Sequence, residues 1–179
     1  MSEIVLTNEA TPATPGSGKI VVFANSGGKL SQVNDAGVVA PLVGGGASYQ
    51  ATPADPTGTN NTTGLMMGLA GAITPATTGR IAISIYGDVQ NTTTADGAKL
   101  GIYYGTGSAP ANAAAITGTS VGSIQNFLAA ANNQRVPFHL TVIVTGLVLG
   151  TAYWIDLMLG ATVGGTAAAK NITVTAFEF

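Results

Sequence analysis

The chain has 179 residues, of which 46% are hydrophobic and only 8% are Asp, Glu, Lys or Arg, whereas roughly 25% charged residues are usual in soluble domains. Six basic residues and a net charge of −2 argue against nucleic acid as a partner, since phosphate binding needs clustered Lys and Arg. The absence of cysteine excludes disulfides and thiolate metal sites. We also expect no membrane-spanning helix and no secretory signal, because every apolar run is short and the first residues lack a basic stretch followed by an apolar block.

Residues 1–42 carry strand and turn signals but little apolar sequence. Three short runs, at residues 19–24, 29–33 and 38–42, are joined by the turn-forming sequences NSGG and NDAG. This pattern predicts a three-stranded β-meander, which is too small to be stable without a surface to dock on. We therefore predict that residues 1–42 form an N-terminal attachment module.

Residues 43–63 are rich in Gly, Pro, Asn and Thr and contain almost no apolar side chain. Such a composition is typical of a linker or an extended arm. The sequence thus places the boundary between the attachment module and the body of the protein within this stretch.

Residues 64–179 show apolar residues at every second position in five segments separated by Gly, Asn and Pro. The alternating positions are Ile81, Ile83 and Ile85; Leu100, Ile102 and Tyr104; Phe138, Leu140, Val142 and Val144; Tyr153, Ile155, Leu157 and Leu159; and Ile172, Val174 and Ala176. Helix signals are weak, even in the Ala-rich stretches 109–116 and 123–134. The prediction is an all-β protein whose body is a jelly-roll-like antiparallel β-sandwich.

The opposite faces of these strands carry few charges, as at Ala82, Gly101, Ile143, Trp154 and Met158. A sheet that faces water usually alternates apolar with polar or charged residues. Uncharged outer faces favour packing against identical neighbours around a symmetry axis, so we expect a homo-oligomer, with a trimer favoured. The alternative is a monomer that tolerates small polar surface residues.

The sequence offers no convincing set of catalytic, cofactor-binding or metal-binding residues. The single histidine, His139, falls within a strand and is expected at the surface or in an interface. Ser120 matches the G-x-S-x-G motif, but no acid lies between it and His139 as the hydrolase order requires, so we interpret it as a loop residue. Asp88 and Asp96 flank a polar stretch, and two carboxylates favour a β-hairpin loop over a calcium site.

Residues 11–42, TPATPGSGKIVVFANSGGKLSQVNDAGVVAPL, resemble a short hairpin module found near the N-terminus of many bacteriophage tail, fibre and appendage proteins. The stretches GLMMGLAGAITPATTGRIAISIYGD, DGAKLGIYYGTGSAPANAAAITGT and RVPFHLTVIVTGLVLGTAYWIDLML resemble a family of phage and prophage proteins regarded as virion components. The resemblance implies a non-enzymatic virion protein, such as a capsid decoration protein or short fibre. Residues 1–42 would then dock on other virion proteins.

A receptor- or carbohydrate-binding tail appendage is the alternative function, with contacts made by the distal loops of the sandwich. Such sites usually present exposed aromatic rings, and Tyr103 and Tyr104 are the best candidates, because Trp154 falls within a strand. Tyr153 ends the sequence L-x-x-G-x-x-Y, which resembles a tyrosine corner and implies a fold-stabilising hydroxyl. The alternative is that Tyr153 is an ordinary core residue.

Overall fold

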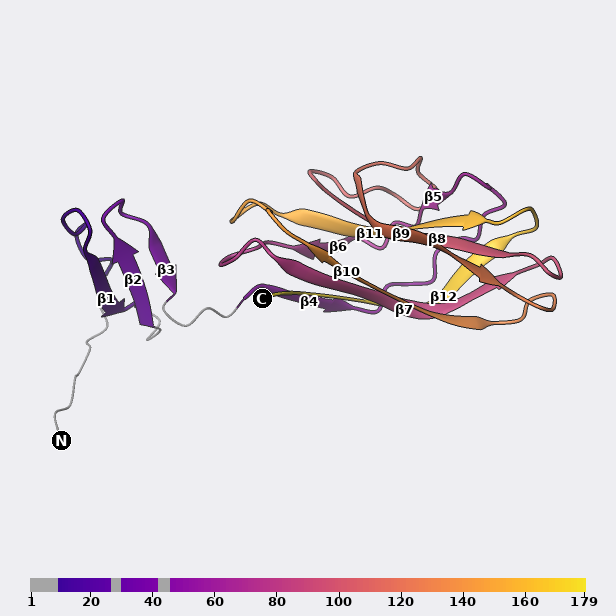
Figure 1. Cartoon of the computed structure of the whole chain (residues 1–179), viewed down its shortest axis with the longest axis horizontal. Helices are drawn as coiled ribbons and strands as arrows, with labels where there is room; N and C mark the ends of the chain where they lie inside the picture. Colours follow the sequence, from indigo (N-terminus) through magenta and orange to yellow (C-terminus); the bar gives the residue numbers. More distant parts are fainter. Residues whose placement is uncertain (1–9, 27–29, 42–45) are drawn as a thin grey trace, which may run out of the picture. The chain divides into compact units, whose positions relative to one another are not determined.

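The computed structural model describes residues 10–26, 30–41 and 46–179, which belong to two compact units, residues 1–45 and 46–179 (Figure 1). The regular secondary structure in these ranges consists of β-strands alone. No helix in them is therefore long and apolar enough to cross a membrane. The predicted all-β class is confirmed.

The first unit is the predicted three-stranded antiparallel meander, in the order β1-β2-β3. Its strands are β1 (Ile20–Ala24), β2 (Leu30–Asn34) and β3 (Val39–Pro41). The turn after β2 is fixed by Asn34, whose side-chain oxygen accepts hydrogen bonds from the backbone N–H groups of Ala36 and Val38. Gly37 supplies the positive φ of 76° that closes this turn.

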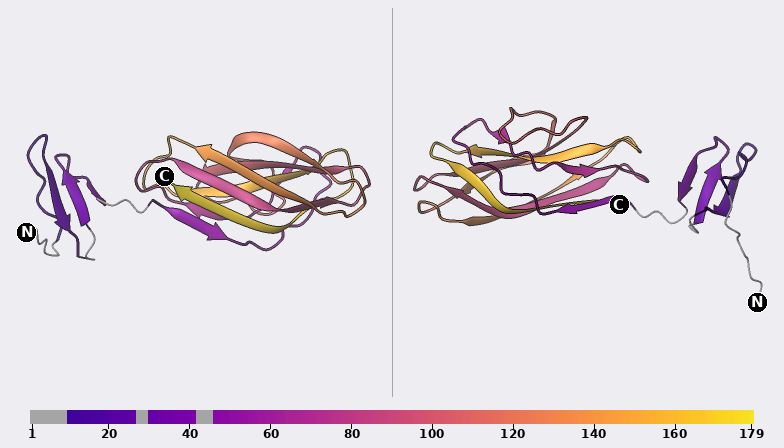
Figure 2. Two further views of the ribbon diagram at one scale, coloured as in Figure 1. Left: turned by 60° about the horizontal axis from the view of Figure 1, so that its bottom comes forward. Right: turned by 180° about the vertical axis from the view of Figure 1, so that it is seen from behind.

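The second unit is a sandwich of two antiparallel sheets, and Figure 2 shows these sheets as stacked layers. The four-stranded sheet has the order β10-β7-β12-β4, and the five-stranded sheet has the order β5-β11-β8-β9, with β6 also paired to β11. The strands are β4 (Ser48–Ala51), β5 (Leu65–Met66), β6 (Gly71–Ile73), β7 (Ile81–Asn91), β8 (Gly97–Thr106), β9 (Thr119–Leu128), β10 (Val136–Val144), β11 (Tyr153–Ala161) and β12 (Ala167–Glu178).

The core lies between the two sheets and is built from the alternating residues that the sequence indicates. Ile81, Ile83 and Ile85 of β7 are fully buried, as are Ile155, Leu157 and Leu159 of β11. These side chains belong to one continuous apolar cluster that also takes in alternating residues of β8, β10 and β12. The predicted antiparallel β-sandwich is therefore confirmed in the strands that carry its core.

Residues 46–63 belong to the second unit, whereas the sequence predicts a linker or an extended arm over residues 43–63. Strand β4 pairs with β12, and Thr59 forms a two-way backbone bridge with Ala167. Both contacts are made by backbone groups, which impose little apolar pattern on the sequence. This is the physical reason why composition alone favours a linker here.

The outer face of the five-stranded sheet is covered by the chain itself around Trp154 and Met158. Met66, Tyr103, Trp154 and Met158 form a second buried cluster, against which Ala114 and Ile116 of the β8–β9 connection pack. Part of the uncharged outer surface that suggested contacts with neighbouring copies is thus buried within one chain. The same does not hold for Ile143 of the other sheet, which is 56% exposed.

Candidate functional site

The outer face of the four-stranded sheet is not covered by any described part of the second unit, and we call it the open face. Toward the Ile81 end of β7 its side chains are Ala82, Ser84 and Tyr86 of β7, His139, Thr141 and Ile143 of β10, and Thr173, Thr175 and Phe177 of β12. Ile143 is 56% exposed and Phe177 52% exposed. None of these nine side chains is Asp, Glu, Lys or Arg, which is unusual for a surface that faces only water. Toward its other end the same face carries Asp88 of β7 and Lys170 of β12, which pair with each other in register.

His139 lies on the open face, at the surface position that the sequence predicts. Its Nε2 atom is 2.6 Å from Ser84 Oγ and 3.1 Å from Thr141 Oγ1, and the ring of Tyr86 meets the imidazole edge-on at 5.9 Å. A Ser-His-acid triad needs a carboxylate bonded to the other ring nitrogen. Among the described residues no carboxylate bonds to His139, so the cluster is a hydroxyl–imidazole network on an exposed sheet.

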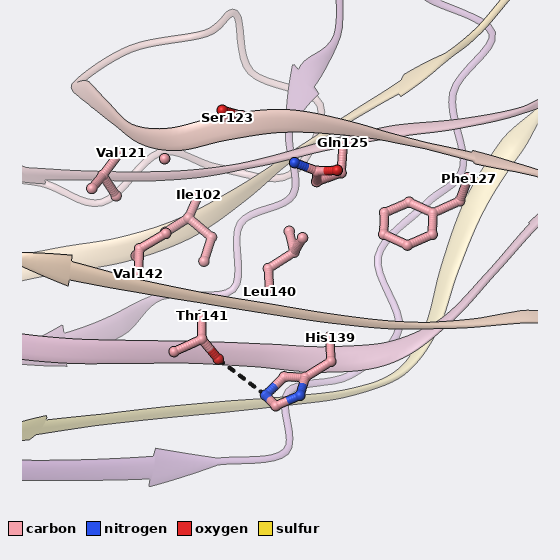
Figure 3. A pocket seen from close by; sticks show the side chains of 10 residues that line it. Ile102, Val121, Ser123, Gln125, Phe127, His139, Leu140, Thr141 and Val142 are labelled. Carbon is pink, nitrogen blue, oxygen red and sulfur yellow. Dashed lines mark hydrogen bonds between the residues drawn. The ribbon is translucent and has the colours of Figure 1, made fainter.

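A groove of about 360 Å³ opens between β9 and β10, the end strands of the two sheets (Figure 3). Figure 3 shows Leu140 on the groove side of β10 and His139 on its opposite side. The lining combines apolar residues with polar ones: Ile102, Val121, Gly122, Phe127, Leu140, Val142, Ser123, Gln125, His139 and Thr141. We call this feature the β9–β10 groove.

Three carboxylates are buried in the second unit, and two of them, Asp156 and Glu178, are not among the candidate residues named from the sequence. Asp156 accepts hydrogen bonds from the backbone N–H groups of Gly68, Leu69 and Leu157. Burial raises the pKa of Asp156, although these hydrogen bonds act in the opposite direction. The residue fixes the segment between β5 and β6 against β11.

Glu178 accepts hydrogen bonds from five backbone N–H groups at distances between 2.5 and 3.1 Å. The donors are Ala47, Ala76, Thr77, Thr78 and Gly79. Burial alone would raise the pKa of Glu178, but these hydrogen bonds outweigh it and hold the pKa well below its usual range. A sequence signal exists, because Glu178 continues the inward series of Ile172, Val174 and Ala176 and so falls on the core side of β12.

Asp96 holds two loops together at one end of the sandwich. It accepts hydrogen bonds from Gly97 N, Val163 N and Gly164 N at 2.7, 3.0 and 2.6 Å, and from Thr162 Oγ1. Burial would raise its pKa, but these hydrogen bonds lower it to about 2. The loop joins β7 of the four-stranded sheet to β8 of the five-stranded sheet, which do not pair with each other. The expected β-hairpin loop is therefore wrong, and the segment is a connection between the two sheets.

Asp88 does not share these partners. Its carboxylate accepts a hydrogen bond from Asn171 and lies 3.8 Å from Arg135. No group of three or more potential metal ligands occurs among residues 10–26, 30–41 and 46–179.

The three tyrosines singled out from the sequence lie in strands rather than in loops. The Tyr153 hydroxyl accepts a hydrogen bond of 3.0 Å from Val148 N, which is the contact that the tyrosine-corner hypothesis requires. Tyr103 is buried in the second cluster and Tyr104 is half-buried, with its ring 6.2 Å from that of Tyr153. Ser120, interpreted above as a loop residue, is in β9 opposite Tyr103.

No family model and no curated protein matches this sequence. Among solved structures, a chain of the T13 particle of infectious bursal disease virus is similar, with a TM-score of 0.47, 10% identity and coverage of 78% of this chain and 33% of that chain. A chain of the Gt strain of the same virus has a TM-score of 0.46 and 12% identity over 88% of this chain and 42% of that chain. The D431N mutant VP2 protein of this virus has a TM-score of 0.43 and 12% identity over 79% of this chain and 38% of that chain. The chain thus spans about two fifths or less of these viral chains, and likeness at this level does not identify a shared function.

Proposed function

We propose that this protein is a non-enzymatic structural component of a virion, which assembles with further copies of itself and with other virion proteins. The open face carries this proposal. Toward the Ile81 end of β7 it presents exposed Ile143 and Phe177 beside hydroxyl side chains, with no charged residue among the nine side chains there, whereas Asp88 and Lys170 lie toward its other end. Large uncharged faces of this kind usually mark contacts with other protein chains.

The more specific role is that of a bacteriophage capsid decoration protein or short fibre. Its support is the resemblance of residues 11–42 and of the sandwich to phage virion proteins. Residues 1–42 would attach the chain to other virion proteins, and the sandwich would form the self-assembling body, with a trimer as the favoured state. The receptor- or carbohydrate-binding alternative has no observation in its favour, since Tyr103 is buried and Tyr104 half-buried in β8.

Light scattering of the purified full-length chain at micromolar concentration tests the self-association part of the proposal. We expect a mass that is a multiple of 17.7 kDa, with three copies favoured. Replacing Ile143 by Lys would place a charge on the open face and should weaken any contact made there. A mass near 17.7 kDa at every concentration tested would contradict self-association.

A further inference from the structure

Strand β9 ends the five-stranded sheet, and β10 ends the four-stranded sheet on the same side of the sandwich. Each end strand has one edge beside which the described residues of the sandwich place no further strand. Such edges are ready templates for pairing with another chain, and soluble proteins commonly guard them with charges, Pro or bulges.

The edge of β10 is guarded in part, whereas that of β9 is poorly guarded. Pro137 lies within β10, and proline cannot donate a hydrogen bond to an added strand. Strand β9 contains no Asp, Glu, Lys, Arg or Pro over its ten residues. A bulge lies opposite Gly101, but residues Gln125–Leu128 keep regular pairing with β8.

Exposure along β9 also points to a missing neighbour. Ile124 is 50% exposed and Leu128 66% exposed, although both lie in a strand of a sheet. On the other side of β9, Phe127 and Gln125 line the β9–β10 groove, above Leu140 of β10. A strand beside β9 would cover this groove and Leu128 at once.

We propose that a second copy of this chain adds a strand to the open edge of β9 alongside Gln125–Leu128 and thereby closes the β9–β10 groove. The inference rests on the proposed self-association and adds to the open face a second contact, at a groove that adjoins it through His139 and Thr141. Charge favours another copy as the occupant. An acidic or basic partner would find no opposite charge on β9 or on the groove walls. A chain with only 8% charged residues brings few unpaired charges to such a contact.

The substitution Gln125→Lys tests this contact, because residue 125 is exposed in the free chain and lines the groove. In the free chain the lysine would remain in water, and the fold should be kept, as far-ultraviolet circular dichroism would show. Docking of a second copy would bury that charge without a partner. Val163→Lys is the matched control, because it adds the same charge at a side chain that is 82% exposed in the β11–β12 loop.

Sedimentation should show the oligomer for the wild type and for Val163→Lys, and at least about a tenfold weaker association for Gln125→Lys, which corresponds to about 1.4 kcal/mol. Amide hydrogen exchange of the wild type should show protection of residues 125–128 that is lost on dilution to the monomer. Oligomers of undiminished stability in Gln125→Lys, with rapid exchange at residues 125–128, would overturn this inference and leave the proposed self-association standing. A wild type that stays monomeric would contradict both.

Discussion

Glu178 shows how one side chain fixes several segments of this sandwich. Its two carboxylate oxygens accept hydrogen bonds from five backbone N–H groups: one at Ala47, just before β4, and four in residues 76–79, just before β7. Hydrogen bonds to a charged acceptor are stronger than neutral ones, and an N–H left buried without a partner is costly. The carboxylate therefore ties the β6–β7 connection and the entry to β4 to the end of β12.

Replacing Glu178 by Gln should lower the free energy of unfolding by about 3 kcal/mol, because the amide group would turn a donor toward backbone donors. Chemical denaturation monitored by tryptophan fluorescence would measure the change. Asp88→Asn serves as the control, since it removes one negative charge from a carboxylate in a solvent-accessible pair with Arg135. The control should change the free energy of unfolding by less than about 1 kcal/mol. An equal loss of stability in both variants would contradict a stabilising role for the five hydrogen bonds to Glu178.

We expect acid to destabilise the sandwich, because two of its carboxylates, Asp96 and Glu178, have lowered pKa values in the folded state. The pKa of Asp96 is about 2 and that of Glu178 is lower than its usual value. The stability that they contribute is present above their unfolded pKa values near 4 and is lost as the pH falls through the folded values. Asp156, with a raised pKa, works in the opposite direction.

Stability should therefore decline between about pH 4 and pH 2, and Asp96→Asn should make that decline shallower. Urea titrations over this range would provide the slope of unfolding free energy against pH. A slope that is identical in wild type and Asp96→Asn would show that this carboxylate carries no such linkage.

Tyr153→Phe removes one hydroxyl and leaves the ring in place. If the hydrogen bond from Val148 N fixes the turn before β11, its loss should lower the free energy of unfolding by about 1 kcal/mol. Association between copies should not change, because Tyr153 is buried in the core. An unchanged thermal midpoint would assign Tyr153 to the ordinary core residues.

At the scale of elements, the β8–β9 connection acts as a cover for the five-stranded sheet. Its residues Ala114 and Ile116 close over Trp154 and Met158, and Gly118 leaves room for the indole ring. A Cβ atom at Gly118 would collide with the Trp154 ring and with the carbonyl oxygen of Tyr104. The glycine also adopts a positive φ of 82°, so both space and backbone conformation call for it.

Gly118→Ala should accordingly destabilise the protein by about 2–4 kcal/mol, through strain at positive φ and crowding of Trp154. Gly107→Ala provides the comparison, because Gly107 has a similar φ of 78° but no atom within 4 Å of the added methyl group. That variant should lose only about 1 kcal/mol. Equal effects on the denaturation midpoint would mean that contact with Trp154 is unimportant.

Sequence periodicity predicted the strands that are buried on one face, and it failed where side chains do not reveal the pairing. Ile81, Ile83 and Ile85 repeat at period two because one face of β7 lines the core. Most side chains of β9 are exposed on both faces, so its sequence has no such alternation. It offers only a weak helix signal over residues 123–134 and a loop interpretation at Ser120. The short strand β4 pairs through its backbone with β12 and has no apolar repeat.

The candidate site was predictable only in outline. An uncharged outer surface is visible in the sequence, but which part of it the chain covers depends on how the β8–β9 connection folds back over Trp154. The role of a buried carboxylate is not visible in the sequence when its partners are backbone N–H groups, which every residue except proline has. Asp156 shows this, since two of its three donors lie 88 and 87 residues away in sequence.

At the scale of the whole chain, the division between Gly45 and Gly46 implies where the protein can be cut. A fragment of residues 46–179 keeps β4, the Thr59–Ala167 bridge and the Ala47–Glu178 hydrogen bond. We expect it to fold with the stability of the full-length sandwich. A fragment that begins at Thr63 should fold but melt at lower temperature, and equal midpoints for both fragments would contradict a structural role for residues 46–62.

We propose that this chain is a structural component of a virus particle and is attached to it through residues 1–42. The most direct test is a reconstruction of purified particles from the virus that encodes it, prepared with the native chain, without it, and with the fragment of residues 46–179 added back. Particles with the native chain should show density for the sandwich in symmetry-related copies. The other two preparations should lack that density. Absence of the chain from native particles would contradict the virion role, whereas decoration by the fragment as complete as by the full chain would contradict attachment through residues 1–42.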